Sequence, residues 1–547
     1  MAEAFDYVIV GAGSAGCILA NRLTENGKYT VCLLEAGPRD WNPFIHIPAG
    51  FIKTLNNPSV NWLYETEPSY WTADRNIDVP RGKTLGGSSS INGHIYNRGQ
   101  RMDFDGWAQR GNQGWGYADV LPYFKRCEQR IGEGDDFFRG REGPLSVTDL
   151  DYQHPLCEAF MRGAQEVGIP RNPDYNGEDQ AGVSYVQRTV RGRRRVSTAR
   201  AFLNPAKGRK NLTIKTDAHA TRLILDNKKA VGVEFSKGGR GGPKLEVRAN
   251  REVIVSGGAI NSPQLLQLSG IGPGDLLREC QIPVMHELKG VGENLRDHYA
   301  PRFAVKVKNI ETLNERAKGI HLLGEIAKYF IGGKSIVNLS ASMVYGFWHT
   351  DPAVKSNDLQ FIFTPASYKP GMHGFFDDHP GFTIAAWQHR PESLGYVRAK
   401  SNDPFQAPAI QPNYLDAEED RRVVVGAMKL ARKLIHTEAL KPYVDAESYP
   451  GESVQTDEEL LEAARHYGNT TYHVMGTCRM APSTDPTSVV DDKLRVRGID
   501  GLRVIDASIM PTMLSANLNA GTMMIAEKGA DLILGKPMLD PIIPSSQ

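Results

Sequence analysis

The N-terminal stretch of the chain carries the pattern that most constrains its fold, a buried strand that runs through a glycine-rich turn into a helix. Residues 7–10 are apolar and β-branched, and Gly11, Gly13 and Gly16 follow at the spacing G-x-G-x-x-G. In such a unit the first glycine makes the tight turn, the second lets the backbone approach a pyrophosphate, and the third packs the helix on the strand. The helix N-terminus supplies positive potential for phosphate groups.

A second predicted strand, residues 29–34, ends at Glu35. This acid follows the glycines at roughly the 20-residue distance expected for a carboxylate that binds a ribose hydroxyl. Glycine-rich turns are common, so the glycines alone would also suit a tight turn in another α/β protein. Because the strands, glycines, helix and acid agree, the stretch predicts a dinucleotide-binding unit.

The size and charge of the chain limit its class. At 547 residues it is too long for one ordinary core, so two or more lobes are expected. Its 64 basic and 63 acidic residues give a net charge of +1, which implies no nucleic-acid partner. No stretch approaches the ~20 apolar residues that span a bilayer, so no transmembrane segment is expected, while peripheral membrane contact stays open.

The cysteines favour a reduced, intracellular setting. All six are scattered without metal-ligand spacing, so no metal site is expected. Cys17 and Cys32 fall within the apolar N-terminal unit, where a buried thiol is the expected state. The first strand begins by about residue 6, which leaves no room for a signal peptide. A cytoplasmic location is therefore expected.

A second glycine-rich segment covers residues 81–94, RGKTLGGSSSINGH. Glycine and small hydroxyl residues cannot build a core, but they let the main chain pass close to a flat ligand and donate N–H bonds. A flexible linker is the alternative reading, and the apolar residues Leu85 and Ile91 within the run argue against it. The segment predicts a loop that lies against a ligand.

Other patterns predict further strands of the same sheet. Residues 211–225 and 230–235 alternate like antiparallel strands about a turn at 226–229. Residues 253–266 repeat the strand–glycine–helix form and would add a strand to the first sheet. A strand over 501–506 ends in Asp506, and a helix over 522–534 closes the chain.

Residues 301–455 differ in character and predict a second lobe. Aromatic and β-branched residues alternate in 360–364 and 382–388, which indicates an antiparallel sheet. Helices are predicted over 117–129, where Pro122 restricts the helix start, and over 152–168, 418–436 and 457–467, the last opened by a capping box at 456–459. The basic run Arg191–Arg195 favours a solvated or structural loop, because a nucleic-acid surface would be wider and carry stacking aromatics.

Taken together, these motifs resemble the glucose–methanol–choline (GMC) oxidoreductases, an FAD-dependent family, along essentially the whole chain. The resemblance rests on separated segments in one order, residues 11–16, 81–97, 257–273, 472–478, 506–511 and 517–519, and is nearest to the bacterial choline-dehydrogenase-like and alcohol-dehydrogenase-like branch. It implies an α/β fold, α+β overall, in which a Rossmann-like FAD-binding domain joins a substrate-binding domain whose antiparallel sheet is covered by helices. The FAD-binding domain would comprise residues 1–155, 206–300 and 456–547, the substrate-binding domain 301–455, and a connecting segment 156–205.

The resemblance also implies which residues contact FAD: Gly11, Gly13, Ser14, Ala15, Gly16, Glu35, Ala36, Thr84, Gly87, Asn92, Gly93, Ala220, Asp506, Ala507 and Asn519. Glu35 would hold the adenosine ribose and Ala220 the adenine, residues 84–93 would line the isoalloxazine, and the C-terminal three would lie near the pyrimidine ring or the diphosphate. Some relatives attach FAD covalently through a histidine. Ile91 occupies that position here, so non-covalent FAD is expected, although the nearby His94 leaves its effect on attachment open.

The family's active-site pair corresponds to His473 and Asn517. An alcohol loses its hydroxyl proton while a hydride leaves the adjacent carbon for flavin N5. Histidine, with an ordinary pKa of ~6.5, can take the proton. Asn517 would orient the alcohol oxygen but cannot titrate, so His473 would be the base, whereas His466 is expected to be structural.

The substrate implied is a primary alcohol of aromatic or aliphatic type, with a sugar or a pyridoxine-like alcohol as the alternative. Choline is disfavoured because a cation needs an aromatic cage and a carboxylate, and residues 338–346 contain no acid. The candidate pocket residues are Phe347, Trp348, Phe361, Phe363, Trp387 and His389. O₂ and a quinone both stay open as electron acceptors. Two other classes remain, a redox-silent FAD-containing hydroxynitrile lyase and an NAD(H) dehydrogenase, but the latter leaves the middle motif and the C-terminal pair unexplained.

Overall fold

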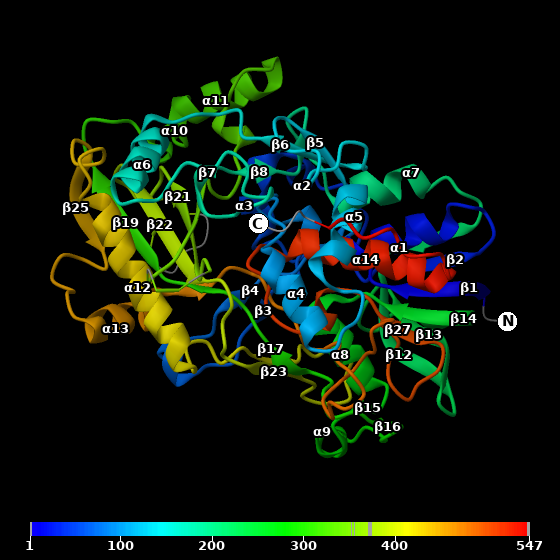
Figure 1. The fold of residues 1–547 in the computed structure, drawn as a ribbon. Helices are drawn as coiled ribbons and strands as arrows, with labels where there is room; N and C mark the ends of the chain where they lie inside the picture. The colour runs from blue at the N-terminus through cyan, green and yellow to red at the C-terminus, as the bar shows by residue number, and fades with distance from the viewer. Residues whose placement is uncertain (1–2, 352, 355, 370–374, 544–547) are drawn as a thin grey trace.

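The protein consists of two lobes, which confirms the predicted combination of a Rossmann-like lobe with an antiparallel one (Figure 1). The computed structural model describes residues 3–351, 353–354, 356–369 and 375–543, so the outer ends of the predicted first and last segments, 1–2 and 544–547, lie outside the described part. The chain passes between the lobes more than once, and the domain limits given above stay a prediction.

The first lobe is built on a sheet that begins with parallel strands. Its order is β11 (Leu212–Lys215), β2 (Val31–Leu34), β1 (Glu3–Val10), β14 (Lys244–Val255), β13 (Lys229–Lys237) and β12 (Ala218–Asp226), with β27 (Leu502–Val504) beside the end of β14. Strands β11, β2, β1, β14 and β27 pair in parallel, whereas β13 and β12 form an antiparallel extension. Every residue of β2 is buried, as expected for a parallel strand covered on both faces.

The prediction of one strand over 211–225 was wrong. The chain turns at Asp217, whose φ of +52° is left-handed, and this turn separates β11 from β12. Strand β11 pairs in parallel with β2, and only β12 forms the hairpin with β13. The alternation of apolar and polar residues continues across the turn at Asp217, so the sequence pattern does not show where one strand ends and the next begins.

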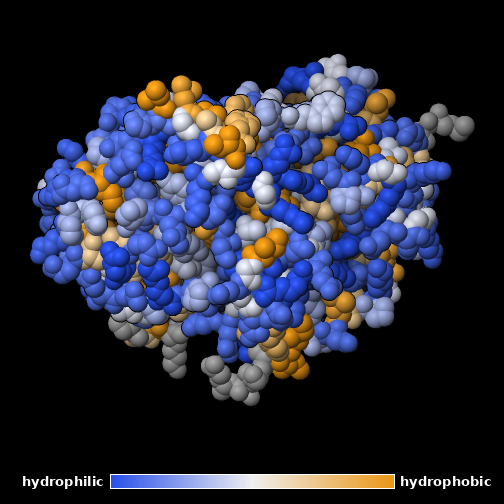
Figure 2. Space-filling model, turned by 90° about the horizontal axis from the view of Figure 1, so that it is seen from above, coloured by the Kyte–Doolittle hydropathy of each residue, from blue (hydrophilic) through white to orange (hydrophobic). Residues whose placement is uncertain are grey.

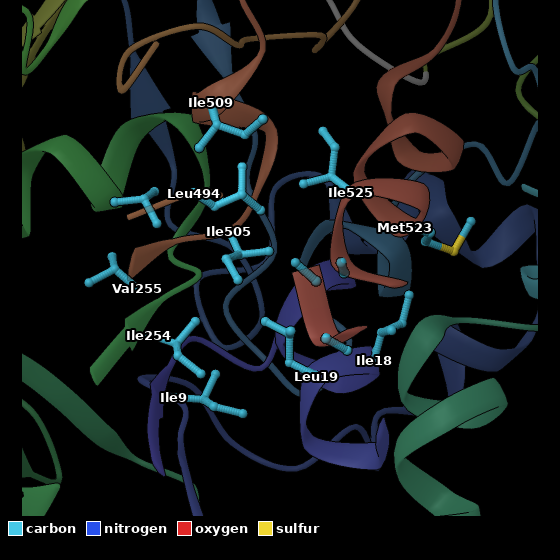
Figure 3. Packing of buried hydrophobic residues seen from close by; sticks show 14 of the residues in the cluster. Ile9, Ile18, Leu19, Ile254, Val255, Leu494, Ile505, Ile509, Met523 and Ile525 are labelled. Atoms are coloured by element: carbon cyan, nitrogen blue, oxygen red, sulfur yellow. The ribbon is translucent and has the colours of Figure 1, made fainter. Parts of the chain in front are cut away.

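Two helices cover one face of this sheet and complete its core. Helix α1 (Ser14–Thr24) packs against α14 (Leu518–Leu534), so the two ends of the chain meet beside β1. The buried apolar cluster at these helices and the sheet includes Ile9, Ile18, Leu19, Ile254, Val255, Leu494, Ile505, Ile509, Met523 and Ile525 (Figure 3). This packing fixes the glycine turn before α1 and the start of α14 relative to each other.

Helix α5 (Tyr117–Cys127) contains Pro122 in its interior rather than near its start. A proline there leaves the carbonyl of Ala118 without its helical donor. The amide of Ile542 donates to that oxygen at 3.0 Å, so the C-terminal segment satisfies it. The prediction of a helix in this segment is confirmed, and the helix accommodates the proline because a residue far away in the sequence supplies the missing donor.

The second lobe contains an antiparallel sheet in the order β25 (Val444–Tyr449), β19 (Arg302–Val307), β22 (Gly381–Gln388), β21 (Leu359–Thr364), β20 (Val344–Trp348) and β7 (Gly182–Tyr185). One face packs on α6 (Pro155–Glu166) and α12 (Glu418–Ile435) through a core that includes Phe303, Phe363 and Ala431. The opposite face turns toward the first lobe, and the functional site lies there.

The remaining elements are short or peripheral. The helices are α2 (Pro43–His46), α3 (Phe51–Thr54), α4 (Arg101–Gln109), α7 (Asn204–Ala206), α8 (Gly258–Leu268), α9 (Gly274–Glu279), α10 (Leu313–Arg316), α11 (Gly319–Ile331) and α13 (Asp457–Tyr467). The strands are β3 (Tyr64–Glu65), β4 (Asp78–Val79), β5 (Glu128–Ile131), β6 (Leu145–Asp149), β8 (Gln187–Arg188), β9 (Val190–Arg191), β10 (Arg194–Arg195), β15 (Ile271–Gly272), β16 (His286–Glu287), β17 (Glu293–Leu295), β18 (Tyr299–Ala300), β23 (Gly395–Arg398), β24 (Ala409–Gln411) and β26 (Asn469–Thr470).

Three general features complete the description. Thr456 and Glu459 form the predicted capping box of α13. All six cysteines are buried and free. In the part of the chain that the structure describes, every helix is too short or too polar to cross a membrane.

Candidate active site

One long cavity runs between the lobes, from the glycine turn of β1 to the open face of the antiparallel sheet. At the turn, Gly11 has a φ of +97°, and a side chain there would lie 2.5 Å from the carbonyl oxygen of Ser256. Gly87 of the middle motif faces Gly13, and a Cβ on Gly87 would lie 2.7 Å from the Gly13 Cα. Two glycine backbones therefore form a narrow cradle at the N-terminus of α1, which suits a pyrophosphate.

Glu35 lies buried at the cavity wall, directly after β2. Its carboxylate accepts hydrogen bonds from the amides of Ala12 and Gly37, both at 2.9 Å. Burial raises the pKa of this carboxyl to about 7, and the two amide donors oppose that shift. The group is held in a fixed position at the end of the sheet where a ribose hydroxyl would bind.

Most residues predicted to contact the cofactor line this cavity: Gly11, Gly13, Ser14, Ala15, Glu35, Ala36, Gly87, Asn92, Gly93, Ala220, Asp506, Ala507 and Asn519. Two others do not. Gly16 packs on the turn, since a Cβ there would lie 1.9 Å from the Gly11 carbonyl oxygen. Thr84 is buried behind the wall, and its hydroxyl donates to the carbonyl of Pro38 at 2.9 Å.

Hydrogen bonds connect the C-terminal residues of this set to the first glycine turn and to the start of α8. Ser14 donates its hydroxyl to the Asn519 side-chain oxygen at 2.6 Å. Asp506 accepts from the Gly258 amide at 2.8 Å and from the Ser262 hydroxyl at 2.5 Å. Ser256, which also lines the cavity, has a buried hydroxyl without a partner among the described residues. The cradle, the fixed acid and this orphaned hydroxyl all fit a bound dinucleotide cofactor.

The middle motif is held against the cavity by a buried cation. Arg195 donates to the Asn92 side-chain oxygen at 2.6 Å and to the Ile45 carbonyl at 2.8 Å. Ile91 and His94 both line the cavity. The ring nitrogens of His94 lie 3.0 Å from the Ser340 hydroxyl and 3.2 Å from the Pro48 carbonyl, so the ring is engaged by protein on both sides.

His473 and Asn517, far apart in the sequence, meet at the other end of the cavity. The Asn517 side-chain nitrogen lies 3.0 Å from Nε2 of His473. The Asn517 oxygen accepts from the Tyr345 hydroxyl at 3.2 Å, which orients the amide so that its nitrogen faces the imidazole. Burial lowers the pKa of His473 well below 6.5, and the neighbouring His298 and Arg81 act in the same direction, so the ring is neutral at pH 7.

A second histidine fixes which nitrogen of His473 is free. Nε2 of His298 lies 2.8 Å from the His389 carbonyl oxygen, and because a carbonyl only accepts, this nitrogen carries hydrogen. Burial lowers the pKa of His298 to about 4, so the ring is neutral and its Nδ1 accepts. Nδ1 of His473 lies 2.9 Å from this accepting nitrogen and 2.8 Å from the Thr471 hydroxyl oxygen, which can accept as well as donate. Nδ1 of His473 must then be the donor, which leaves Nε2 of His473 with its lone pair toward Asn517.

Asp297 holds the backbone of both histidines. Its carboxylate accepts from the amides of His473 at 2.7 Å and His298 at 2.9 Å. The hydroxyl of Tyr414 donates to it at 2.6 Å, and Thr470 supplies another hydroxyl donor. Burial raises the pKa of this carboxyl, whereas its donors and Arg81 oppose the shift.

The substrate side of the cavity is one face of the antiparallel sheet. Tyr345, Ile362, Ala385 and Arg302 lie side by side on β20, β21, β22 and β19 in register, and all four line the cavity. The Arg302 guanidinium lies 5.9 Å from the ring centre of Tyr368. Among the described residues, the carboxylates that line the cavity are Glu35 and Asp506, both in the first lobe.

Only one of the six pocket candidates from the sequence reaches this wall. Trp387 lines the cavity, with its ring centre 6.3 Å from that of His473. Phe361 and Phe363 lie on the other face and pack on Phe160, while Phe347 is covered by Tyr175. Trp348 stacks on His349, and His389 contributes its carbonyl rather than its ring. Alternation gives the period of a strand but not which face meets the ligand.

Sequence reasoning missed His298, Asp297, Arg302 and Arg195. The Asp297–His298 pair follows a Gly-x-Gly-Glu-Asn segment in the sequence, but nothing in its spacing ties it to His473. Arg302 occupies an alternating position of a strand and Arg195 ends a basic run, so the sequence predicts only a structural role for each. No group of three or more His, Cys, Asp or Glu side chains in the described ranges could hold a metal ion.

Comparison with known proteins gives a consistent result. The chain matches the family description GMC oxidoreductase over residues 5–300 and again over 391–526. An oxygen-dependent choline dehydrogenase from Photobacterium profundum is 40% identical over 550 residues, covering 99% of this chain and 95% of the relative. The mitochondrial choline dehydrogenase of Mus musculus is 39% identical over 555 residues, covering 98% of this chain and 91% of the relative.

Solved structures agree over nearly the whole chain. Pyridoxine 4-oxidase from Mesorbium loti is 31% identical with a TM-score of 0.85, covering 96% of this chain and 98% of that one. A formate oxidase is 27% identical with a TM-score of 0.89, covering 98% of both chains.

Proposed function

Because the chain belongs to the GMC oxidoreductase family and is an FAD-dependent alcohol oxidoreductase, we propose that it oxidises a primary alcohol to the aldehyde with His473 as the base. One observation carries this proposal. The hydrogen-bonded series from the His389 carbonyl through His298 to His473 leaves an unprotonated Nε2 next to Asn517 at the cavity wall.

The base works through this free nitrogen. Nε2 of His473 accepts the hydroxyl proton of the alcohol, while Nδ1–H of His473 stays hydrogen-bonded to Nδ1 of His298. The resulting imidazolium carries hydrogen on both nitrogens, with Nδ1–H still bonded to His298. The ring needs neither rotation nor a change of tautomer before it reacts.

Asn517 holds the alcohol oxygen beside the base. In the structure its side-chain nitrogen is 3.0 Å from Nε2 of His473, and a bound alcohol oxygen would take over this donor. Tyr345 keeps the amide oriented through its bond to the Asn517 oxygen at 3.2 Å. The amide N–H thus stabilises the developing negative charge on the oxygen.

FAD, when bound, supplies the acceptor for the hydride that leaves the alcohol carbon. Glu35 would bind the ribose, the glycines at the N-terminus of α1 would bind the pyrophosphate, and Asn92 and Gly93 would face the flavin ring. Ile91 stands where some relatives carry the attaching histidine, and the His94 ring is bonded to protein on both sides, which supports non-covalent FAD.

The charge of the cavity wall favours an alcohol without a positive charge. A quaternary ammonium is bound by an aromatic cage, usually with a carboxylate. Trp387 and Tyr345 supply aromatic surface, but the ionised group on the described part of the substrate wall is Arg302. Although choline dehydrogenases are relatives, we infer that an aromatic or aliphatic primary alcohol is preferred here, with a pyridoxine-like alcohol second.

Oxygen or a quinone-type carrier would reoxidise the enzyme, and the buried free cysteines support a reducing, cytoplasmic compartment. Contact with the membrane surface would bring a quinone within reach.

The test is anaerobic mixing of the purified FAD enzyme with benzyl alcohol, a medium-chain alcohol, pyridoxine, a sugar and choline, while the flavin absorbance is followed. We expect rapid bleaching by an uncharged primary alcohol and slower bleaching by choline. Fast recovery of the yellow colour in air would then identify an oxidase, and slow recovery a dehydrogenase. If the flavin stays yellow with every alcohol and the enzyme cleaves a cyanohydrin, the protein is a lyase instead.

A further inference from the structure

Helix α11 exposes its apolar side to solvent and buries part of its polar side, the reverse of a helix that covers a core. Its large apolar side chains point outward, with Ile320, Leu323, Ile326, Phe330 and Ile331 between 37% and 84% exposed. Glu325 and Tyr329 on its other side are buried. At 100° per residue the five apolar residues share one side of the helix, so they form a continuous stripe.

Polar bonds, rather than an apolar interface, hold the helix in place. The Glu325 carboxylate accepts from the Ile336 amide at 3.0 Å and from the Lys328 ammonium at 2.8 Å. The Tyr329 hydroxyl donates to the Arg193 carbonyl at 2.7 Å. The buried side of the helix therefore has its own partners, and the apolar stripe is a separate, solvent-exposed side of α11.

The basic run that the proposed function did not explain lies against this helix. Hairpin β9–β10 carries Arg191, Arg193 and Arg194, and the Arg193 guanidinium lies 5.7 Å from the Tyr329 ring centre. Lys334 follows the helix and is exposed. Within the described ranges, no carboxylate lies within 4.0 Å of the side-chain nitrogens of Arg191, Arg194 or Lys334. Figure 2, which looks down on the side of the molecule where α11 lies, shows apolar side chains next to strongly polar ones.

We propose that α11 and hairpin β9–β10 form a docking surface for a membrane that contains anionic lipids. The apolar stripe would enter the interface between headgroups and acyl chains, and the arginines would bind phosphate groups beside it. An apolar stripe flanked by unpaired cations is the pattern that such a surface requires.

A second copy of the chain fits this surface less well. A two-fold contact through α11 would bring the cations of both hairpins to one interface, and within the described ranges no carboxylate lies within 4.0 Å of Arg191, Arg194 or Lys334 to neutralise them. A lipid surface offers the opposite charge and apolar depth together.

Docking here would bring the membrane close to the active-site cavity. Segment 336–338 packs on α11 and is followed by Ala341 and Ser342, which line the cavity. The segment also contacts the turn at 48–50, which precedes the cavity residues Phe51 and Ile52. This consequence rests on the proposed function, whereas membrane binding itself does not, because vesicle binding is measured without turnover.

The experiment is flotation of the FAD-loaded enzyme with vesicles of phosphatidylcholine alone or with phosphatidylglycerol in equal parts, at low and high salt. Wild-type protein should float with the anionic vesicles and be released by salt. The pair Ile320→Glu with Phe330→Glu, and the pair Arg191→Glu with Arg194→Glu, should each reduce the bound fraction at least tenfold. Leu245→Glu with Leu394→Glu places two acids on other exposed apolar positions and should leave binding unchanged.

Flavin absorbance and alcohol-dependent bleaching are measured on every variant, so a misfolded protein or a wrong functional assignment is recognised separately. The proposal is overturned if wild-type enzyme does not float with anionic vesicles, or if the α11 variants float as well as wild type. A dimer that dissociates when Ile320 and Phe330 are replaced, without vesicle binding, would make the surface a subunit contact instead.

Discussion

At the scale of single residues, the ring of His298 governs the chemistry of its neighbour. His298 donates through Nε2 to a main-chain carbonyl, which does not titrate, and so presents an accepting Nδ1 to His473. The Thr471 hydroxyl lies 2.8 Å from the same nitrogen, but a hydroxyl can donate or accept and so does not by itself set the tautomer. A carboxylate in place of His298 would strengthen the base by stabilising its protonated form. A neutral histidine sets the tautomer without adding charge. We infer that His298 is a positioning residue.

Replacing His298 by alanine should lower the rate of flavin reduction roughly 10²-fold, because His473 could then carry its hydrogen on either nitrogen. His298→Asn should recover much of the loss, since an amide can donate to the His389 carbonyl and accept from Nδ1 of His473. Stopped-flow reduction across a range of alcohol concentrations separates rate from binding, and we expect the binding constant to change little. Equal losses in both variants would show that the ring acts only by packing.

His473→Ala should keep yellow FAD and lose about 10²- to 10⁴-fold in flavin reduction, the usual contribution of a general base. Asn517→Ala should lose about tenfold, because one hydrogen bond to the alcohol oxygen is removed while the base remains. Both are measured anaerobically with the best alcohol of the panel, and FAD content is checked by absorbance. Normal reduction in His473→Ala would contradict the assignment of the base.

The pH dependence follows from the lowered pKa of His473. The base acts only when it is unprotonated, so the rate falls as the pH drops below the pKa in the folded enzyme, which lies well below 6.5. Flavin reduction at low alcohol concentration should therefore stay constant from pH 8 down through 6.5 and decline only at lower pH. A midpoint at or above ~6.5, the ordinary histidine value, would contradict the buried neutral ring.

At this scale the sequence predicted the residues with a family motif and missed those without one. His473 and Asn517 were found because their segments resemble the family, and the structure brings them within 3.0 Å. His298 and Asp297 were missed because their role depends on the pairing of β18 with β26, which brings distant segments together. Single-sequence spacing contains no information about such a pair.

At the scale of elements, the antiparallel sheet places a cation at one end of the substrate wall. The row Tyr345–Ile362–Ala385–Arg302 crosses four strands, so the cation lies three strand spacings, roughly 14 Å, from the strand that bears Tyr345. A charge at such a distance changes selectivity rather than the chemical step.

Arg302→Gln should raise the rate of reduction by choline relative to an uncharged alcohol by about fivefold, because a repulsion of roughly 1 kcal/mol between two cations in a wet cavity is removed. Arg302→Lys keeps the charge and should leave the ratio unchanged. The ratio of the second-order rate constants for choline and benzyl alcohol is the measurement. An unchanged ratio in Arg302→Gln would mean that the guanidinium does not act on the bound alcohol.

The sequence was informative about elements where local periodicity decides the structure. The unit β1–α1–β2, the long helix α12 and the capping box of α13 all follow from local pattern, and the structure has them. Partner choice did not follow, since residues 211–215 read as part of a hairpin but pair with β2. The sequence also did not predict which face of the sheet lines the cavity, because Phe361 and Trp387 have equally apolar neighbours in the sequence.

At the scale of the whole molecule, the wall of the cofactor cavity is formed by segments from distant parts of the chain. Its wall combines the turn after β1, the middle motif, the segment after β14, and the residues around Asp506 and Asn517. Ser256 has a buried hydroxyl without a partner in the described chain, and the glycines leave the cradle without side chains. A ligand that fills the cavity therefore adds contacts between these segments that the protein alone lacks.

Removing FAD should accordingly lower the melting temperature, and adding it back should raise the value with FAD concentration. Ligand at a hundred times its Kd stabilises by about 2.7 kcal/mol, which for a chain of this size is a shift of a few degrees. Glu35→Gln keeps an acceptor for the Ala12 amide but weakens the bond to ribose, so about tenfold more FAD should be needed for the same shift. Arg302→Gln lies at the far end of the cavity and serves as the control, with an unchanged FAD requirement. Equal melting temperatures with and without FAD would mean that the folded enzyme binds FAD no more tightly than the unfolded chain does, and this outcome would contradict the assignment of the cavity as the FAD site.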